Sequence, residues 1–264
     1  MSMSIPVYLF TGFLDAGKTA FIQETLEDPG FNTGEKTLVL LCEEGENEYR
    51  PERFAGGNVS FLPVEEQAGL TTAFLKDYQK KHRVDRVLIE YNGMWPLQAL
   101  YDALPTDWDI YQIILLADST TFASYMTNMR QLAVDKLQDP EMVIFNRCTD
   151  ATDKAYLHRA VRMVNRRAQM AFERTDGSVD PDDVVDELPF DTDACHRHRG
   201  RGFRAVVSGR YGQPGQIHGQ DRALQGLCLS DAPCAQGLLC ARPLRHDMLR
   251  RGYLFHRFYL RGGK

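Results

Sequence analysis

The sequence predicts an α/β fold, a three-layer sandwich in which helices cover both faces of a mostly parallel sheet. Apolar segments of strand length alternate with segments of helical spacing along residues 5–175, which indicates repeated βαβ units. The strand segments are mainly apolar and do not alternate between apolar and polar residues, as in strands that are buried on both faces. A glycine-containing loop also joins the first strand to the first helix.

Strands are expected wherever a short apolar run lies beside a turn signal. Residues 36–42, for example, follow the turn signal Asn32-Thr-Gly, and residues 110–117 (I-Y-Q-I-I-L-L-A) predict a strand buried on both faces. In chain order the expected strands cover residues 5–11, 36–42, 59–63, 84–91, 110–117 and 142–146.

Helices are expected where apolar residues recur every three or four positions. Leu70, Phe74, Leu75 and Tyr78 have this spacing, and basic residues close the segment. In chain order the expected helices cover residues 18–26, 70–81, 95–104, 120–137 and 152–165. Together with the strands they predict one domain over residues 1–175.

The composition changes abruptly near residue 195. Residues 195–264 hold 13 of the 31 Lys and Arg residues but only three of the 36 Asp and Glu residues. The preceding segment, residues 176–194, is acidic and contains Pro, so we expect a linker there. The predicted organisation is therefore a domain (1–175), an acidic linker (176–194) and an irregular Arg/Gly-rich tail (195–264).

The tail allows three interpretations. A basic segment is typical of nucleic-acid binding, and a segment without periodicity is typical of a disordered extension. We favour a third hypothesis, a frameshifted translation that disrupts a C-terminal domain from about Ala194. Excess Arg, Gly, Cys and His with almost no Lys or Glu is what a GC-rich gene gives out of frame. Nucleic acid is then not an expected partner, and sequencing the encoding DNA tests the hypothesis.

Several classes of protein are disfavoured by the sequence. No run approaches the roughly 20 apolar residues of a membrane helix, and the first residues do not resemble a secretory signal. We therefore expect a cytoplasmic protein without membrane contact. Its six cysteines form no C-x-x-C pair, and in the cytoplasm they are expected as thiols or metal ligands rather than disulfides.

The segment G-F-L-D-A-G-K-T between the first strand and the first helix matches the phosphate-binding loop, or P-loop, of nucleotide-binding proteins. Glycines let backbone N–H groups turn toward phosphate oxygens, and the helix N-terminus favours the same negative charge. Lys18 is expected to reach the β- and γ-phosphates, and Thr19 to hold Mg²⁺. The expected nucleotide-binding residues of this segment are Gly12, Asp15, Ala16, Gly17, Lys18, Thr19 and Ala20.

Four segments carry a resemblance to the CobW/HypB/UreG family of P-loop GTPases. They are V-Y-L-F-T-G-F-L-D-A-G-K-T from Val7, I-E-Y-N-G-M-W-P-L from Ile89, A-D-S-T-T-F from Ala117 and V-I-F-N-R-C-T-D from Val143. The resemblance covers residues 5–175. It implies a GTP-hydrolysing domain with Mg²⁺ that helps deliver a metal, or a metal-containing cofactor, to client metalloproteins.

The family pattern also assigns residues beyond the P-loop. Glu90 and Gly93 match its E-x-x-G, so the resemblance gives Glu90 a role in holding Mg²⁺ or orienting the attacking water. Asn146 and Arg147 stand where the family has the first two residues of the base-reading N-K-x-D. Thr149 replaces its Asp, and a hydroxyl cannot accept two hydrogen bonds from guanine as a carboxylate does. Asp150, one position later, is a possible substitute.

The family's internal metal motif, C-x-C-C after the second strand, is absent. This stretch offers Cys42 with Glu43, Glu44 and Glu46 instead. A thiolate beside carboxylates is suited to Zn²⁺ or another transition metal. The alternative for Cys42 is a buried strand cysteine followed by a solvated acidic loop.

These features predict a GTP-binding and GTP-hydrolysing protein with a metallochaperone-like role, in which Lys18 and Glu90 are the catalytic residues. Two alternatives stay open. The altered Thr149 favours an ATP-using P-loop enzyme, and a degraded GTPase would be a nucleotide-binding module without turnover.

Overall fold

The computed structural model describes residues 4–45 and 48–185. Within them, eight strands form one sheet in the order β3-β2-β4-β1-β5-β6-β7-β8, so that β1 lies in its interior. Seven strands are parallel, and β8 pairs antiparallel with β7. The strands are β1 (Ile5–Thr11), β2 (Thr37–Leu41), β3 (Val59–Pro63), β4 (Arg86–Glu90), β5 (Trp108–Asp118), β6 (Met142–Cys148), β7 (Gln169–Arg174) and β8 (Val179–Pro181).

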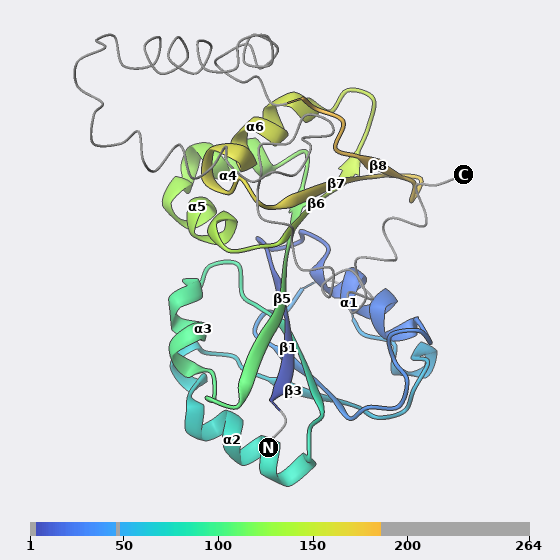
Figure 1. Ribbon diagram of the computed structural model, residues 1–264, viewed down its shortest axis with the longest axis vertical. Helices are drawn as coiled ribbons and strands as arrows, with labels where there is room; N and C mark the ends of the chain where they lie inside the picture. The colour runs from blue at the N-terminus through green and yellow to red at the C-terminus, as the bar shows by residue number, and fades with distance from the viewer. Residues whose placement is uncertain (1–3, 46–47, 186–264) are drawn as a thin grey trace, which may run out of the picture. The chain divides into compact units, whose positions relative to one another are not determined.

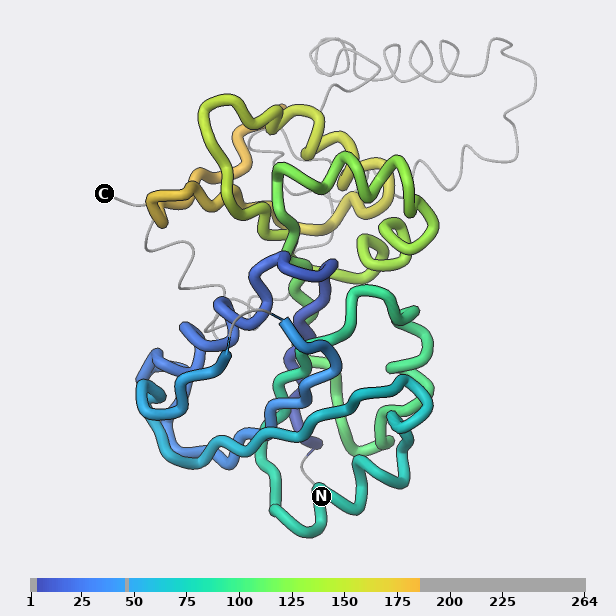
Figure 2. The backbone as a smooth tube through the Cα atoms, turned by 180° about the vertical axis from the view of Figure 1, so that it is seen from behind, coloured from blue at the N-terminus to red at the C-terminus, as the bar shows by residue number. Residues whose placement is uncertain are grey.

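Helices connect the parallel strands and cover the sheet on two sides. In Figure 1, α1 lies on one side of the sheet, whereas α2 and α3 lie on the other. Figure 2 shows the chain from behind, with β1 (blue) and β5 (green) passing through the middle. The helices are α1 (Lys18–Glu27), α2 (Thr72–His82), α3 (Leu97–Ala103), α4 (Phe122–Asn128), α5 (Arg130–Gln138) and α6 (Lys154–Val164).

Successive residues of each parallel strand enter opposite cores, because neighbouring side chains on a strand point to opposite faces. Leu9 packs with residues of α2 and α3, whereas Phe10 packs with Phe21 and Ile22 of α1. Residues of α4, α5 and α6 form a third cluster against β5, β6 and β7. This arrangement confirms the predicted helix–sheet–helix sandwich, and it explains why the strands read as apolar on both faces.

Two departures from the expected elements concern helix continuity and the end of the sheet. The helix expected over residues 120–137 is divided into α4 and α5 at Met129, whose φ of −131° and ψ of 40° are not helical. The sheet also continues beyond residue 175, since β8 lies within the segment expected to be a linker. Residues 186–194 of that linker, the Arg/Gly-rich tail and the frameshift hypothesis lie outside the described residues.

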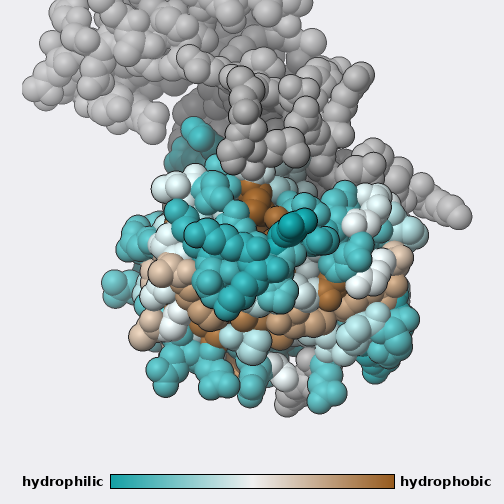
Figure 3. All heavy atoms as spheres, turned by 90° about the horizontal axis from the view of Figure 1, so that it is seen from below, coloured by the Kyte–Doolittle hydropathy of each residue, from teal (hydrophilic) through white to brown (hydrophobic). Residues whose placement is uncertain are grey.

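The surface at the end of the domain where β1 begins is mainly polar. Figure 3 shows this end with hydrophilic residues around a band of apolar ones. Among the described residues, none of the helices combines the length and the apolar character needed to cross a bilayer.

Candidate functional site: a phosphate loop at the carboxyl end of the sheet

The P-loop joins β1 to α1 at the carboxyl ends of the parallel strands, the edge at which ligands bind in open α/β sheets. Gly17 caps the start of α1 with a φ of 86°, a left-handed conformation that an L side chain adopts only with strain. A Cβ atom there would also lie 2.6 Å from Nδ2 of Asn146. Gly17 is therefore required both by the turn and by the close approach of β6.

The remaining loop residues differ in exposure. Ala16 is buried, whereas Asp15 and, in the first turn of α1, Ala20 are exposed. Asp15 has a φ of 57°. It stands where the resembled family commonly has Gly, so its strained backbone identifies this position as one that favours glycine.

Lys18 lies beneath the loop rather than extending into solvent, and its side chain is 2% exposed. Its Nζ donates hydrogen bonds to the carbonyls of Gly12 (2.9 Å) and Phe13 (2.8 Å), and it forms an ion pair with Glu43. The ammonium is thus held at the loop by backbone oxygens and one carboxylate.

Glu43 follows β2 and connects the P-loop to the segment after β4. While Oε2 pairs with Lys18, Oε1 accepts a hydrogen bond from the backbone N–H of Gly93 at 3.1 Å. A Cβ atom on Gly93 would lie 2.7 Å from the carbonyl oxygen of Gly12 and from Cα of Phe13. Only glycine fits this contact, so the E-x-x-G segment packs directly against the phosphate loop.

The Glu90 carboxylate accepts hydrogen bonds from two hydroxyl groups, one of which is in the first turn of α1. Its Oε1 accepts a hydrogen bond from Thr19 Oγ1 (2.6 Å), and its Oε2 accepts one from the Tyr49 hydroxyl (2.5 Å). Burial raises the pKa of the Glu90 carboxyl, against the opposing effect of these two hydrogen bonds and of Lys18. The structure thus brings Thr19 and Glu90 together as predicted from the sequence.

Hydroxyl and carboxylate oxygens are the ligands that Mg²⁺ prefers. The pair formed by Thr19 and Glu90 adjoins the phosphate loop, and Mg²⁺ sites in nucleotide-binding proteins combine such ligands with phosphate oxygens. The residues present therefore fit Mg²⁺.

Asn146 and Arg147, at the end of β6, contact different parts of the structure. Asn146 Nδ2 donates a hydrogen bond to the carbonyl of Ala16 at 2.7 Å, which ties β6 to the P-loop. Arg147 has a φ of 53°, and its guanidinium pairs with Asp118 at the end of β5. Asp118 also accepts hydrogen bonds from the backbone N–H and the hydroxyl of Thr120. Asp118 therefore orients Arg147.

The side chains of Thr149 and Asp150, which follow Arg147, both have partners in the structure. Thr149 Oγ1 accepts a hydrogen bond from the backbone N–H of Ala151 at 3.3 Å. Asp150, the possible substitute for the missing Asp, pairs with Arg174 at 2.5 Å instead. The Asp150 side chain is 91% exposed, so this is a surface ion pair of the kind that contributes little to stability.

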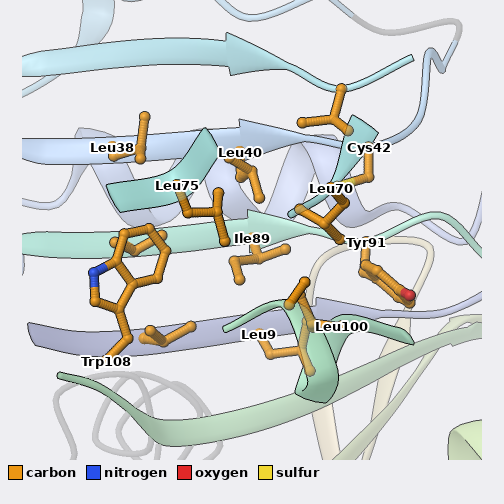
Figure 4. Close-up of a cluster of buried hydrophobic side chains, with 14 of the residues drawn as sticks. Leu9, Leu38, Leu40, Cys42, Leu70, Leu75, Ile89, Tyr91, Leu100 and Trp108 are labelled. Atoms are coloured by element: carbon orange, nitrogen blue, oxygen red, sulfur yellow. The ribbon is translucent and has the colours of Figure 1, made fainter. Parts of the chain in front are cut away.

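Cys42 does not fit the predicted role of a metal ligand. Its side chain lies in the hydrophobic cluster on the α2 and α3 face, close to Leu70 and Tyr91 (Figure 4). Burial raises the pKa of its thiol to about 12, so the metal-binding thiolate is disfavoured. No group of three or more potential metal-binding His, Cys, Asp or Glu side chains occurs among residues 4–45 and 48–185. Cys42 is therefore buried, as in the alternative, but the Glu43 side chain is only 8% exposed rather than solvated. Glu46 lies outside the described residues.

The profile of the CobW/HypB/UreG nucleotide-binding domain matches residues 6–172. The chain belongs to the CobW/HypB/UreG family. The match spans the P-loop, Glu90, Asn146 and every parallel strand except the first residue of β1 and the last two of β7. No curated protein matches the chain.

Three solved structures illustrate what this chain is similar to. Zn(II)-bound YjiA GTPase from E. coli is 22% identical, with a TM-score of 0.47 over 63% of this chain and 57% of that one. A Zn(II)-bound triple mutant of YjiA is 24% identical, with a TM-score of 0.50 over 67% and 59%. Hydrogenase maturation factor HypB from Archaeoglobus fulgidus is 14% identical, with a TM-score of 0.47 over 66% and 83%. The chain spans less than two thirds of the length of the YjiA structures.

The sequence does not indicate that Tyr49 is a site residue, and it indicates Glu43 only as part of a possible metal site. Tyr49 lies in an irregular segment between β2 and β3, where no periodicity marks a functional side chain. The acidic run after β2 marks Glu43 as a charged residue at the end of a strand, but its nearness to Lys18 is seen only in the structure.

Proposed function

We propose that this CobW/HypB/UreG family member binds GTP and hydrolyses it. The observation that carries the proposal is the arrangement of Gly17, Lys18 and Thr19 at the loop. The Lys18 ammonium is held beneath the loop, and the Thr19 hydroxyl donates a hydrogen bond to Glu90. Backbone N–H groups at the N-terminus of α1 would bind the phosphates. Lys18 would offset the negative charge that develops on the γ-phosphate as water attacks.

Thr19 and Glu90 would hold Mg²⁺. The ion supplies positive charge that neutralises the phosphate oxygens. Glu90 has a second role in the proposal, because its carboxylate orients the Thr19 hydroxyl while Tyr49 fixes the other carboxylate oxygen. These residues keep the ligands in place before nucleotide binds.

ATP is the second candidate for the nucleotide. It is favoured by Thr149, which replaces the family's Asp and whose hydroxyl accepts a hydrogen bond from the Ala151 N–H. With Thr149 at the position of the family's Asp, that position lacks the carboxylate that distinguishes guanine N1–H and its 2-amino group from adenine. We rank GTP first because of family membership.

We also propose a metallochaperone-like role, in which the nucleotide state changes the protein's hold on a metal ion or a client metalloprotein in the cytoplasm. Family membership supports this role. Since Cys42 does not fit a metal ligand, the proposal does not place the metal at that residue.

The test is competition between the two nucleotides, followed by phosphate release. A fluorescent GTP analogue bound to the full chain with Mg²⁺ should be displaced by GTP at lower concentration than by ATP. Slow release of inorganic phosphate from GTP should accompany binding. Tighter binding of ATP would support the second candidate, and binding without any phosphate release would contradict the proposed hydrolysis.

A further inference from the structure

We infer that Glu43 is a specificity-determining residue of the nucleotide site, one that sets the preference between nucleoside triphosphate and diphosphate. It does so by holding the two hydrogen-bond donors that a terminal phosphate requires. The inference rests on the proposed nucleotide-binding function and names a further residue of that site.

The Glu43 carboxylate engages both donors at once. Oε2 pairs with the Lys18 ammonium, and Oε1 accepts the Gly93 N–H at 3.1 Å. The side chains of Lys18 and Glu43 are only 2% and 8% exposed. At such burial a charge-assisted contact is stronger than the same contact in water, and leaving either partner alone is costly.

Both donors lie where a γ-phosphate would be recognised. Lys18 also donates to the carbonyls of Gly12 and Phe13, so its ammonium is at the loop. Gly93 packs against the same two loop residues, close enough that a Cβ atom would clash at 2.7 Å. One carboxylate bridges the two donors, and the oxygens of a phosphoryl group are anionic acceptors of similar spacing.

A nucleoside triphosphate therefore competes with the Glu43 carboxylate for more hydrogen-bond donors than a diphosphate does. The γ-phosphate must displace Glu43 from both Lys18 and Gly93. A diphosphate lacks the group that would take the Gly93 N–H, so Glu43 can keep that hydrogen bond. The charge of Glu43 consequently weakens triphosphate binding more than diphosphate binding.

The position of Glu43 also allows its side chain to change conformation and release Lys18 and Gly93. It follows β2 at the edge of the sheet, and the next residues, Glu44 and Gly45, are exposed. Cys42 is anchored by its backbone N–H, which donates to the carbonyl of Glu90 at 2.9 Å. The strand can therefore stay in place while the carboxylate leaves.

The experiment compares dissociation constants of fluorescent GDP and a fluorescent non-hydrolysable GTP analogue for the full chain and for Glu43→Gln. Glutamine keeps the size but removes the charge. Triphosphate affinity should rise about tenfold and diphosphate affinity less than about threefold, because one charge-assisted contact no longer has to be displaced. Binding, and not turnover, is measured, so a change in hydrolysis does not affect the result.

The matched control is Glu44→Gln, which removes an adjacent exposed charge and should leave the ratio of the two constants unchanged. An unchanged ratio in Glu43→Gln, or an equal change in Glu44→Gln, overturns the inference and leaves the proposed function standing. Failure of the wild-type chain to bind either nucleotide overturns both. If Glu43→Gln does not fold, Glu43→Met serves, because methionine also removes the charge, keeps a similar length and suits a buried position. The ratio should shift in the same direction, and an unchanged ratio overturns the inference.

Discussion

Glu90 is the residue on which the proposed Mg²⁺ site depends, and its ionisation gives that site a pH dependence. Burial raises the pKa of this carboxyl above its ordinary value. The neutral form replaces the carboxylate at a higher pH than it would for an exposed glutamate. As pH falls, the Mg²⁺-dependent part of nucleotide affinity should therefore be lost before ordinary carboxylates titrate. Titrations with Mg²⁺ and with EDTA across the acidic range measure that part, and a loss confined to pH below the ordinary glutamate pKa would contradict the expectation.

Tyr49 should shift that pH dependence, because its hydroxyl donates to the ionised form of Glu90. In Tyr49→Phe the carboxylate loses one donor, so its pKa should rise further. A hydrogen bond to a charged group contributes about 1.5–3 kcal/mol. The midpoint for loss of Mg²⁺-dependent binding should then move upward by about one pH unit or more. Tyr101→Phe is the control, since that tyrosine bonds Asp139 far from the loop in sequence. An equal shift in both variants would show that the effect is not local.

Asp15 combines a strained backbone with a negative charge at the phosphate loop. Its φ of 57° is in the left-handed region, which costs a non-glycine residue about 1 kcal/mol. Asp15→Gly should raise the free energy of unfolding by up to about 1 kcal/mol and also tighten nucleotide binding. Asp15→Ala keeps the strain but removes the charge, so it should tighten binding without the gain in stability. Chemical denaturation and nucleotide titration separate the two effects, and weaker binding in both variants would contradict the account.

The P-loop residues could be predicted from the sequence because each performs a local function set by spacing along the chain. Thr19 and Glu90 could be paired because the resemblance supplied the second residue. The engagement of Lys18 by Glu43 could not be predicted, since it depends on the distance between two loops that follow different strands.

At the scale of elements, α5 supports the segment that follows β4. Lys136 is 1% exposed, and its Nζ donates to the carbonyl of Trp95 and lies 4.8 Å from the centre of the Tyr91 ring. Asp135 accepts a hydrogen bond from the Leu97 N–H at 3.0 Å. Helix α5 thus fixes the chain between Glu90 and α3, which includes Gly93.

Lys136 should make the stability of the domain depend on pH under alkaline conditions. Burial lowers its pKa from 10.5 to about 8. Between these values the unfolded chain binds a proton that the folded chain does not, so stability rises with pH by about 1 kcal/mol per unit. Urea denaturation from pH 8 to 10 should show this rise in wild type relative to Lys136→Met. Parallel curves for the two proteins would contradict the shift.

Short apolar strands are the elements whose bounds the sequence predicts best. Strand β1 was predicted at its observed bounds, and β3 likewise. The break at Met129 was missed because residues 120–137 keep helical spacing on both sides of it. Strand β8 was missed because a three-residue edge strand has too few residues to show a period.

The whole domain should extend past residue 175. Asp180 of β8 accepts from Lys154 at 2.7 Å, and Asp182 contacts His158 and Arg162 of α6 at 2.9 and 3.4 Å. A chain ending at residue 175 loses these contacts as well as the pairing of β7 with β8. Its free energy of unfolding should be lower by at least about 2 kcal/mol than that of a chain ending at residue 184. Equal stability of the two chains in urea denaturation would show that the last strand contributes nothing.

Nucleotide binding at the P-loop is the central claim, and a calorimetric titration of GTP with Mg²⁺ into wild type and Lys18→Ala measures it most directly. The Lys18 ammonium is held at the loop by the carbonyls of Gly12 and Phe13. Wild type should bind one GTP per chain, and the variant should show no measurable binding while its thermal unfolding stays cooperative. Equal affinity in the two proteins would contradict the account.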